Sequence, residues 1–188
     1  EPNFEDGTGD IVWEWHLWDH LIQDVDPSLP NYGQLSDYPE LLNINFGPAG
    51  SMGGPGIAPH ADWIHVNAIA YNQELDQIVM SFRDPNEIII IDHSTTTEEA
   101  AGHTGGIYGK GGDFLYRWGN PLNYNRGTWI YHHLLNGQHG VNWIPTGYPG
   151  EGNLIIYNNY FYFIDELQDE PIINSENPYS AVIEIIPP

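Results

Sequence analysis

The chain has 188 residues, and its 26 Asp and Glu against four Lys and Arg give it a net charge of −22 at pH 7. Nucleic acids and anionic membranes bind basic surfaces, so this balance argues against both as partners. The chain has no Cys, which excludes a disulfide framework and thiol chemistry. We interpret the acidity as a solvated surface, such as a saline setting favours, rather than an acidic interaction surface.

The composition favours an all-β fold. Seven Trp, twelve Tyr and six Phe accompany 21 Gly and 15 Pro, which is typical of short strands joined by tight turns. No run approaches the roughly 20 apolar residues that a membrane helix needs. Because the chain begins at Glu1 rather than Met, we expect a mature fragment or part of a longer polypeptide.

The N-terminal part combines one predicted strand with a long loop. Residues 10–18 alternate in the manner of a strand, with Trp13 and Trp15 on one face. Residues 23–59 are polar and rich in Gly and Pro, which predicts a long surface loop with one helical turn near 38–42. Loops of this length usually serve a site or an interface.

Residues 62–83 contain the clearest element of the chain. Two apolar-rich runs flank a polar turn at 72–76, which predicts a β-hairpin. Alternation places His65 and Asn67 on one side of the first strand, and Arg83 ends the second strand beside the start of the first. An imidazole, an amide and a guanidinium at one end of a hairpin form a candidate anion-binding site.

Two further strands extend this hairpin into a four-stranded meander. Residues 87–92 form an unbroken β-branched run, which predicts a buried strand. A Gly-rich excursion over 94–112 leads to a fourth predicted strand at 113–118. A similar order of predicted strands follows at 138–144, 153–158, 160–165 and 181–186.

Repeated four-stranded antiparallel units are typical of the blades of a β-propeller. His139 follows His65 by 74 positions, and each opens the first strand of its unit. We therefore predict that residues 1–188 are part of a single β-propeller domain. Its predicted parts are the outer strand of a preceding blade at 10–20, a long loop at 21–61, one blade at 62–121 and the next at 137–188.

About two blades cannot close a ring, since closure takes about four to eight. We expect the remaining blades in missing chain or in another subunit, because open sheet edges are usually paired or protected. In a propeller, the first strand of each blade starts at one rim of the central channel, so His65 and His139 should meet there. His20 follows the predicted N-terminal strand and could reach the same rim. A single His is more often a structural hydrogen-bonding group, but three at equivalent positions beside Asn67 and Arg83 favour a functional site.

Six segments carry a resemblance to a known family. They are VWEWHLWDHLIQD (12–24), DWIHVNAI (62–69), SFR (81–83), IDHSTT (91–96), YRWGNP (116–121) and GQH (137–139). They resemble the bacterial arylsulfotransferases, which need no nucleotide sulfate donor, and the resemblance extends in order from about residue 10 to residue 188. It implies a six-bladed propeller, of which this chain is the middle part. It also implies transfer of a sulfuryl group from a phenolic sulfate ester to another phenol through a sulfated histidine.

The resemblance implies a role for each site residue. The His of Gln-His, here His139, is the nucleophile, and a neutral imidazole suits two-step covalent transfer. His65, Asn67 and Arg83 bind the sulfate oxygens and stabilise charge on the transferring group. His20 protonates the leaving phenolate or binds sulfate.

Two tryptophans near the histidines, Trp63 and Trp143, are candidates for stacking on an aryl ring. The chain departs from the family pattern at two places. Gly140 stands where Asp usually follows Gln-His, and Tyr160 stands where Gly usually follows two Asn. The missing Asp is a group that could orient the nucleophilic imidazole.

The sequence predicts no cofactor and no metal site, with one candidate left open. Asp24 and Asp26 with loop carbonyls could hold Ca²⁺, although the Gly and the terminal Glu of an EF-hand are missing. The other histidines lack a partner at metal-ligand spacing, and we interpret them as structural or solvent-exposed. They are His16, His60, His93 and His103; the adjacent His132 and His133 would point to opposite faces of a strand, a poor metal pair, and we interpret them in the same way.

Two functions stay open at this point. The first is an extracytoplasmic enzyme (periplasmic, cell-surface or secreted) whose partners are aryl sulfates and phenolic small molecules. The alternative is a non-catalytic β-propeller that serves as a binding or structural surface protein, in which the altered motifs mark lost activity. Neither function involves a nucleic acid or a membrane span.

Overall fold

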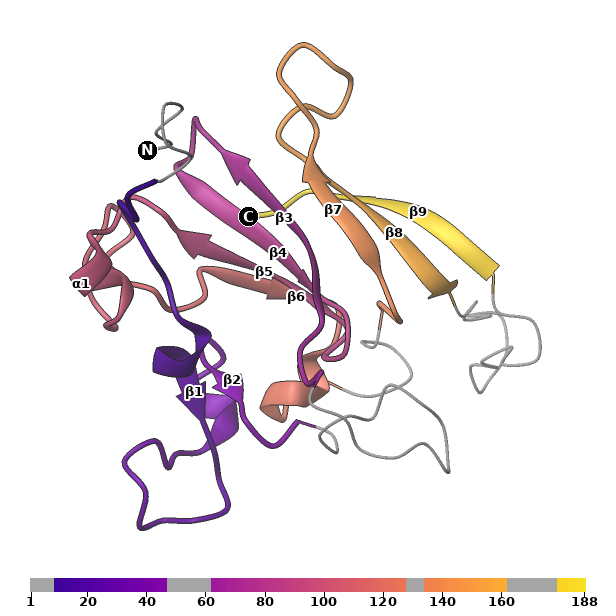
Figure 1. The fold of residues 1–188 in the computed structure, drawn as a ribbon. Helices are drawn as coiled ribbons and strands as arrows, with labels where there is room; N and C mark the ends of the chain where they lie inside the picture. Colours follow the sequence, from indigo (N-terminus) through magenta and orange to yellow (C-terminus); the bar gives the residue numbers. More distant parts are fainter. Residues whose placement is uncertain (1–8, 47–61, 128–133, 162–178) are drawn as a thin grey trace.

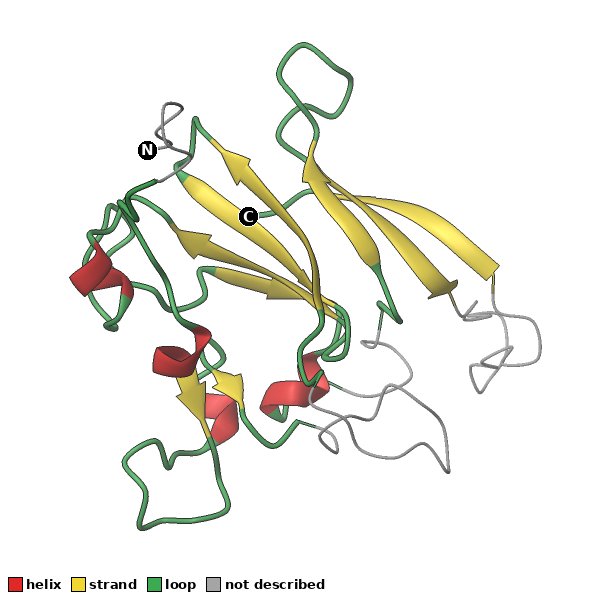
Figure 2. Cartoon of the chain, viewed as in Figure 1, coloured by secondary structure: helices red, strands yellow, loops and turns green. Residues whose placement is uncertain are grey.

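The computed structural model describes residues 9–46, 62–127, 134–161 and 179–188 (Figure 1). This part of the chain is mostly β-sheet, with a four-stranded, a three-stranded and a two-stranded sheet and little helix (Figure 2). The all-β prediction is therefore confirmed. No sheet closes into a ring within the described residues, so the propeller stays a prediction. No helix among these residues has the length and apolarity to cross a membrane.

The first sheet is the predicted meander. Its antiparallel strands lie in the order β3 (Val66–Asn72), β4 (Gln77–Phe82), β5 (Glu87–Asp92) and β6 (Tyr116–Trp118). The turn between β3 and β4 depends on Asn72, whose Oδ1 accepts hydrogen bonds from the backbone N–H groups of Glu74 and Leu75. Asp76 then takes a φ of 50°, a left-handed conformation that Asp tolerates better than most residues.

The isoleucine run of β5 is buried on both faces of this sheet. Ile89 and Ile91 belong to one core cluster, whereas Ile88 and Ile90 belong to a second cluster shared with the other large sheet. Because side chains alternate along a strand, burial on both faces needs an apolar residue at every position. Full burial of each isoleucine is worth about 1.5–3 kcal/mol. This explains why an unbroken apolar run, rather than an alternating one, occupies the middle of the sheet.

The N-terminal segment lies against the first sheet without joining it. Residues 10–16 form no strand, so the predicted N-terminal strand is wrong. Trp13 Nε1 donates to Thr95 Oγ1 at 3.2 Å, and Trp15 Nε1 donates to Gly112 O at 2.8 Å. Both indoles also pack on the first core cluster. The alternating tryptophans thus cover the sheet with their side chains, while their backbone pairs with no edge.

Short elements follow this segment. They are η1 (Leu17–His20), β1 (Leu21–Ile22), η2 (Leu35–Asp37) and β2 (Leu42–Asn43). The parallel pairing of β1 with β2 interrupts the long loop predicted at 23–59. The helical turn, η2, lies a few residues before the predicted 38–42. Residues 47–61 are outside the described part.

The Gly-rich excursion between β5 and β6 carries one short helix, α1 (Thr97–Ala100). Thr96 and Glu99 form a reciprocal capping box at its start. The 3₁₀-helix η3 (Pro121–Tyr124) follows β6.

The second sheet has three described strands rather than the four predicted. They are β7 (His139–Trp143), β8 (Leu154–Phe161) and β9 (Tyr179–Ile185), antiparallel and in that order. The single strand β8 covers most of the strand predicted at 153–158 and the first residues of the strand predicted at 160–165. The pairing of β8 with β9 shifts register between Asn158 and Phe161, where the sequence predicted a break between two strands. Residues 162–178 are outside the described part.

The two large sheets lie side by side, with β7 packed against β3 and β4 (Figure 1). Val141 and Leu154 of the second sheet share a core cluster with Val79 and Ile88 of the first. This packing brings the starts of β3 and β7 together.

Candidate functional site

Two histidines meet where β3 and β7 begin. His65 immediately precedes β3, and His139 is the first residue of β7. Their ring centroids are 6.5 Å apart, and the ring planes are inclined by 70°. The structure thus brings together two histidines that are 74 positions apart in the chain. A small group bound at this junction could contact both rings.

An acidic side chain orients the ring of His65. Its Nδ1 bonds to the carboxylate of Asp62, and because an ionised carboxylate only accepts hydrogen bonds, Nδ1 carries a proton. The side chain is 34% exposed. Nε2 is therefore the nitrogen that this ring can offer to a ligand. The backbone at His65 has a φ of 51°, and the strand register shifts between Val66 and Ala68.

Asn67 links the two sheets. Its Nδ2 donates to Gln138 O at 2.7 Å, which ties β3 to the residue before His139. Its Oδ1 is buried and has no hydrogen-bond partner among the described residues. The simple alternation that placed Asn67 beside His65 is disturbed by the bulge between them. The contact that the structure shows for Asn67 is therefore one that positions β7.

Hydrogen bonds fix the ring of His139 through one nitrogen. Nδ1 lies 2.9 Å from Gly137 O, and Asn159 Nδ2 lies 2.6 Å from the same carbonyl and 3.0 Å from Nδ1. A carbonyl oxygen only accepts, and Asn159 Nδ2 already donates to it at 2.6 Å, so we infer the tautomer in which Nδ1 carries the proton and donates to Gly137 O, while the 3.0 Å approach of Asn159 Nδ2 to Nδ1 is a contact and not a hydrogen bond. The lone pair of the half-buried ring is then on Nε2. This is the protonation state that a nucleophilic imidazole needs.

Two amides that sequence reasoning did not select hold His139 in place. Asn159 makes the contacts just described, and Gln138 is fully buried. Gln138 Nε2 donates to Phe82 O at 2.8 Å and to Glu87 O at 3.0 Å, so it fastens the start of β7 to the turn between β4 and β5. In the sequence, each amide is marked only by standing next to a residue of a proposed motif. Asn and Gln are too common for this position alone to identify them as supporting residues.

Arg83 lies beside His65, as the hairpin geometry predicts. Its backbone N–H donates to His65 O at 3.2 Å, and its Nη1 donates to Asp84 Oδ1 at 3.0 Å. Burial raises the pKa of Asp84, and the guanidinium of Arg83 opposes this effect. The backbone of Arg83 thus lies beside that of His65, and its guanidinium is held by the largely buried carboxylate of the next residue.

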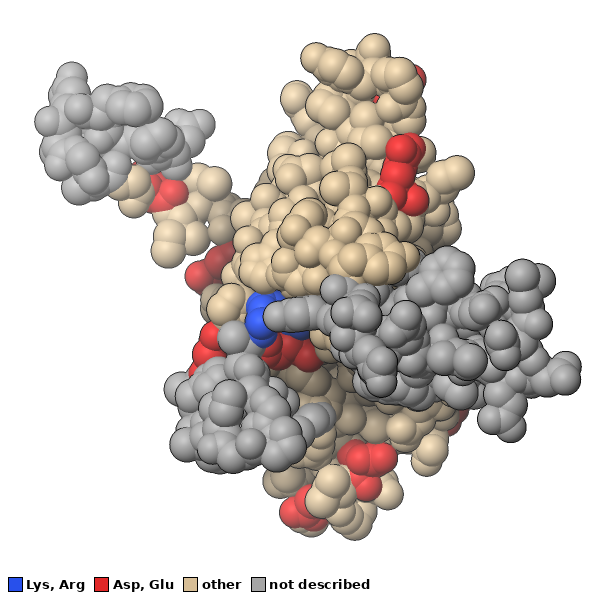
Figure 3. All heavy atoms as spheres, turned by 90° about the vertical axis from the view of Figure 1, so that its right-hand side faces the viewer, with Lys and Arg blue, Asp and Glu red and all other residues tan. Residues whose placement is uncertain are grey.

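The other two arginines have structural roles. Arg117 is buried in an ion pair with Glu87, and Arg126 Nε donates to Ser36 O at 3.0 Å. On the face drawn in Figure 3, Asp and Glu are dispersed, whereas Lys and Arg surface at one small patch. Among the arginines, Arg83 is the one beside the histidine pair. Cations are so scarce in this chain that its position favours an anionic ligand at this junction.

His20 is not part of this pair, contrary to the predicted shared rim. It ends η1 and is fully buried. Its Nδ1 lies 2.8 Å from Asp113 Oδ1 and its Nε2 lies 2.8 Å from Ala100 O, while its ring stacks on Trp15. The position follows from the N-terminal segment covering the first sheet instead of forming the outer strand of another blade. With both nitrogens bonded, His20 has no contact with the His65–His139 junction.

The two predicted stacking residues lie in different places. Trp63 is two positions before His65, and its half-buried ring stacks on Phe46 at 5.3 Å between centroids. Trp143 is at the opposite end of β7 from His139, about 13 Å along the strand at about 3.3 Å per residue. It packs on the second core cluster. Trp63 therefore stays a candidate for contact with an aryl group, whereas Trp143 is too distant.

The two departures from the family pattern fall on irregular backbone. Gly140 has a φ of 65° within the bulge of β7, where an added Cβ would meet no atom within 4 Å. Space for a Cβ is thus present, but the left-handed backbone favours Gly. Tyr160 lies in β8, and its side chain is outside the described part.

The calcium candidate is weakened by local bonding. Asp26 Oδ1 accepts hydrogen bonds from both the N–H and the hydroxyl of Ser28, at 2.9 and 2.7 Å. The Ser28 hydroxyl is the main cause that lowers the pKa of Asp26. This carboxylate therefore closes a turn. Within the described residues, the group with metal-ligand geometry is a different one, made of His20, His103 and Asp113.

The chain was also compared with known proteins. The family model described as "Arylsulfotransferase (ASST)" matches residues 3–184, nearly the whole chain. Searches of curated proteins and of solved structures found no match.

Proposed function

The chain belongs to the arylsulfotransferase family, and on this basis we propose that it transfers a sulfuryl group from a phenolic sulfate ester to a phenol, with His139 as the nucleophile. The observation that carries the proposal is the hydrogen bonding of His139. In the tautomer inferred from the contact with Gly137 O, Nδ1 carries the proton, so the lone pair of Nε2 is available for attack.

The reaction would proceed in two displacements at sulfur. In the first, His139 Nε2 attacks the sulfur atom, an N–S bond forms, the S–O bond to the aryl group breaks, and the phenolate leaves and takes a proton from solvent. In the second, the oxygen of the acceptor phenol attacks sulfur, the N–S bond breaks, and the phenolic proton passes to solvent. His139 is regenerated, so the two half-reactions balance without a co-reactant.

Gly137 O assists the first displacement. Sulfation of Nε2 makes the imidazole ring cationic while Nδ1 keeps its proton. The carbonyl dipole at 2.9 Å is already oriented toward that proton, so it stabilises the charge as it develops. Asn159 donates to the same carbonyl at 2.6 Å and thereby helps to fix its direction.

His65 and Arg83 would bind the oxygens of the transferring group, Arg83 through its guanidinium and His65 through the Nε2–H that the ring has when both nitrogens are protonated. Both lie at the open end of the β3–β4 hairpin, His65 before β3 and Arg83 after β4, and each is held by a carboxylate, Asp62 for the ring and Asp84 for the guanidinium. Preorganised donors of this kind stabilise the charge on a transferring sulfuryl group as they do on a phosphoryl group. Asn67 would act mainly as a positioning residue for β7. His20 has no part in this mechanism, because its contacts lie elsewhere.

The test uses the full chain, p-nitrophenyl sulfate as donor and phenol as acceptor. We expect the wild type to release p-nitrophenol and His139→Asn to release none above background. The control is His16→Asn, the same substitution at an exposed histidine away from the junction. Mass spectrometry of the protein mixed with donor alone should show one added SO₃ in wild type and in His16→Asn only.

Equal release by wild type and His139→Asn would contradict the proposal. A folded wild type that neither releases p-nitrophenol nor gains SO₃ would also contradict it. That second result would favour the alternative, a non-catalytic binding or structural protein.

A further inference from the structure

A second histidine cluster lies on the other side of the first sheet from β7. His20 Nδ1 and His103 Nδ1 each lie 2.8 Å from Asp113 Oδ1. The three atoms are within 4.8 Å of one another. His20 comes from the end of η1, and the other two residues come from the two ends of the loop between α1 and β6. The spacing in the sequence did not reveal this group, because residue 20 is more than 80 positions from the others.

The protonation of His20 limits what can lie between its Nδ1 and the carboxylate of Asp113. Its Nε2 faces Ala100 O at 2.8 Å, and since a carbonyl only accepts, that nitrogen carries a proton. In a neutral ring, Nδ1 then directs a lone pair at the carboxylate of Asp113, which is repulsive. A proton, carried by the ring or by the carboxyl group, or else a metal ion must therefore lie between them. A ring nitrogen bonded to a backbone carbonyl while the other faces the ligand site is the usual arrangement of a metal-bound histidine.

The buried part of the cluster, His20 and the loop backbone beside it, is held in place before any ligand arrives. The ring of His20 stacks on Trp15, with centroids 5.4 Å apart and planes inclined by 2°. Gly112 packs against the Nε2 edge of the same ring, where only Gly fits, since a Cβ there would lie 2.0 Å from Ala100 O and 2.6 Å from His20 Nε2. The bond from Gly112 N to Gly102 O, at 3.0 Å, joins the two ends of the loop that carry the remaining ligands. Such preorganisation lowers the cost of ordering ligands around an ion.

From these contacts we propose that His20 Nδ1, His103 Nδ1 and an oxygen of Asp113 bind a divalent transition metal ion of the Zn²⁺ class. Two imidazoles and one carboxylate suit Zn²⁺ better than Ca²⁺ or Mg²⁺, which prefer oxygen ligands. Ligand atoms about 2.0–2.1 Å from a tetrahedral ion are about 3.3 Å apart, so the 2.8 Å contacts need to open slightly. His103 is 61% exposed and can move to allow this.

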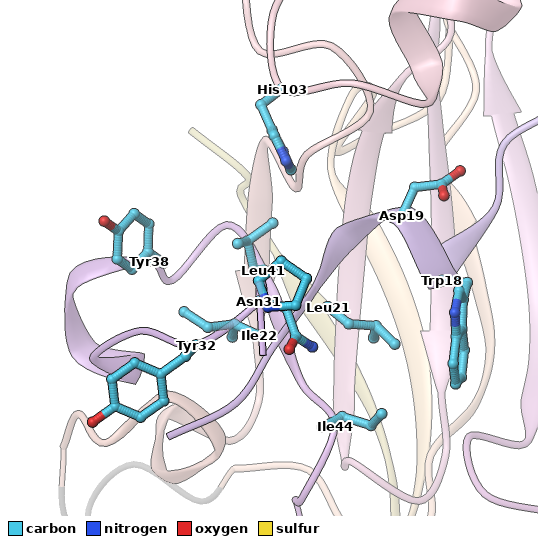
Figure 4. A pocket seen from close by; sticks show the side chains of 11 residues that line it. Trp18, Asp19, Leu21, Ile22, Asn31, Tyr32, Tyr38, Leu41, Ile44 and His103 are labelled. Atoms are coloured by element: carbon cyan, nitrogen blue, oxygen red, sulfur yellow. The ribbon is translucent and has the colours of Figure 1, made fainter. Parts of the chain in front are cut away.

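The fourth coordination position is left for solvent or a ligand. His103 also lines a cavity of about 430 Å³, whose wall includes Trp18, Tyr32 and Tyr38 (Figure 4). The exposed side of the cluster is therefore next to a partly aromatic cavity. Three protein ligands with one open position are typical of zinc sites that do more than hold a fold together.

The experiment titrates the chelator-treated full chain with Zn²⁺ in the presence of excess Ca²⁺, which occupies the many surface carboxylates. Isothermal calorimetry should show one saturable Zn²⁺ per chain. The test variant is His103→Gln, whose amide can still donate to Asp113 but is a poor metal ligand, and we expect it to weaken binding by about 10- to 100-fold or more. The control is His16→Gln, because His16 is equally exposed (60%) and also lies beside carboxylates.

Two further readouts separate this site from non-specific binding. Co²⁺ should give the intense visible absorption of a low-coordinate nitrogen-containing site in wild type and in His16→Gln. Zn²⁺ should raise the thermal unfolding temperature of the same two proteins and not that of His103→Gln. The proposal is overturned if wild type shows no saturable Zn²⁺ binding above Ca²⁺, or if His103→Gln binds as wild type does. Either result would identify the cluster as a protonated hydrogen-bond group only.

Discussion

The two histidine clusters of this chain differ in how the ring nitrogens are used. At the junction of the two sheets, His65 and His139 each have Nδ1 bonded to an acceptor, and each ring is partly exposed. His20 has both nitrogens bonded and is fully buried. The same side chain is therefore open to a substrate in one place and, in the other, fully engaged by groups of the protein. The partner of each nitrogen, rather than the residue type, decides which role a histidine can have.

The largest expected effect is the loss of sulfuryl transfer when a histidine of the junction is replaced. His139→Asn should lower turnover of p-nitrophenyl sulfate by about 10³-fold or more, because it removes the proposed nucleophile. Its free energy of unfolding should change by no more than about 1 kcal/mol, since the side chain is only half-buried. Steady-state kinetics and urea unfolding of the same preparation check both numbers. A large loss of stability would mean that His139 is structural.

The opposite effect is expected at the other cluster. His20→Ala should lower the free energy of unfolding by about 3 kcal/mol, since it removes the ring from Ala100 O, leaves Asp113 with His103 as its remaining ring partner, and opens a cavity beside Trp15. Urea unfolding measures this loss. His16→Ala, at an exposed position, should stay within about 0.5 kcal/mol of wild type. Similar stabilities for the two variants would contradict the buried role of His20.

A smaller effect is expected from the amide that supports His139. Asn159→Ala should lower kcat about five- to tenfold with little change in KM, because it removes one hydrogen bond, worth about 1 kcal/mol, from Gly137 O and frees the imidazole to rotate. Asn142→Ala is the matched control, since Asn142 Nδ2 donates to Gly140 O on the exposed side of the same strand. A change in KM alone would place Asn159 in substrate binding instead.

The smallest expected effect concerns pH and the carboxylates beside these histidines. Burial raises the pKa of Asp84 above 3.8, so the folded state holds this proton more tightly than the unfolded chain does. The contribution of Asp84 to the free energy of unfolding is therefore fully present below its pKa in the unfolded chain and is lost as pH rises through its pKa in the folded state. Asp84→Asn should remove this decline of the unfolding free energy with rising pH. Urea unfolding at a series of pH values above about 4 measures it.

Asp76 provides a control of the opposite sign. Its hydrogen bond with His93, and then that with Tyr71, lowers its pKa below 3.8. Its contribution is therefore present above the unfolded pKa and is lost as pH falls through the folded pKa. Asp76→Asn should remove a loss of stability at acid pH. If both substitutions changed the pH slope in the same direction, the assignment of burial to Asp84 would be wrong.

Local sequence signals predicted the first sheet well. The hairpin, the buried isoleucine strand and the meander depend on alternation and on turn residues such as Asn72, which act over a few positions. The junction of His65 with His139 was predicted from the repeat of strand order. The same signals failed for residues 10–16, whose alternating tryptophans are explained by side-chain contacts with Thr95 and Gly112.

The sequence by itself determined the all-β class, the family, and the placement of His65, Arg83 and His139 at one end of neighbouring strands, because strand period and motif order are written along the chain. Only the tertiary structure decided the rest. It removed His20 from the junction, separated Trp143 from His139, and assembled His20 with His103 and Asp113. The reason is physical. The hydrogen-bond partners of both His20 nitrogens come from segments far away in the chain, and a local sequence pattern cannot predict those partners.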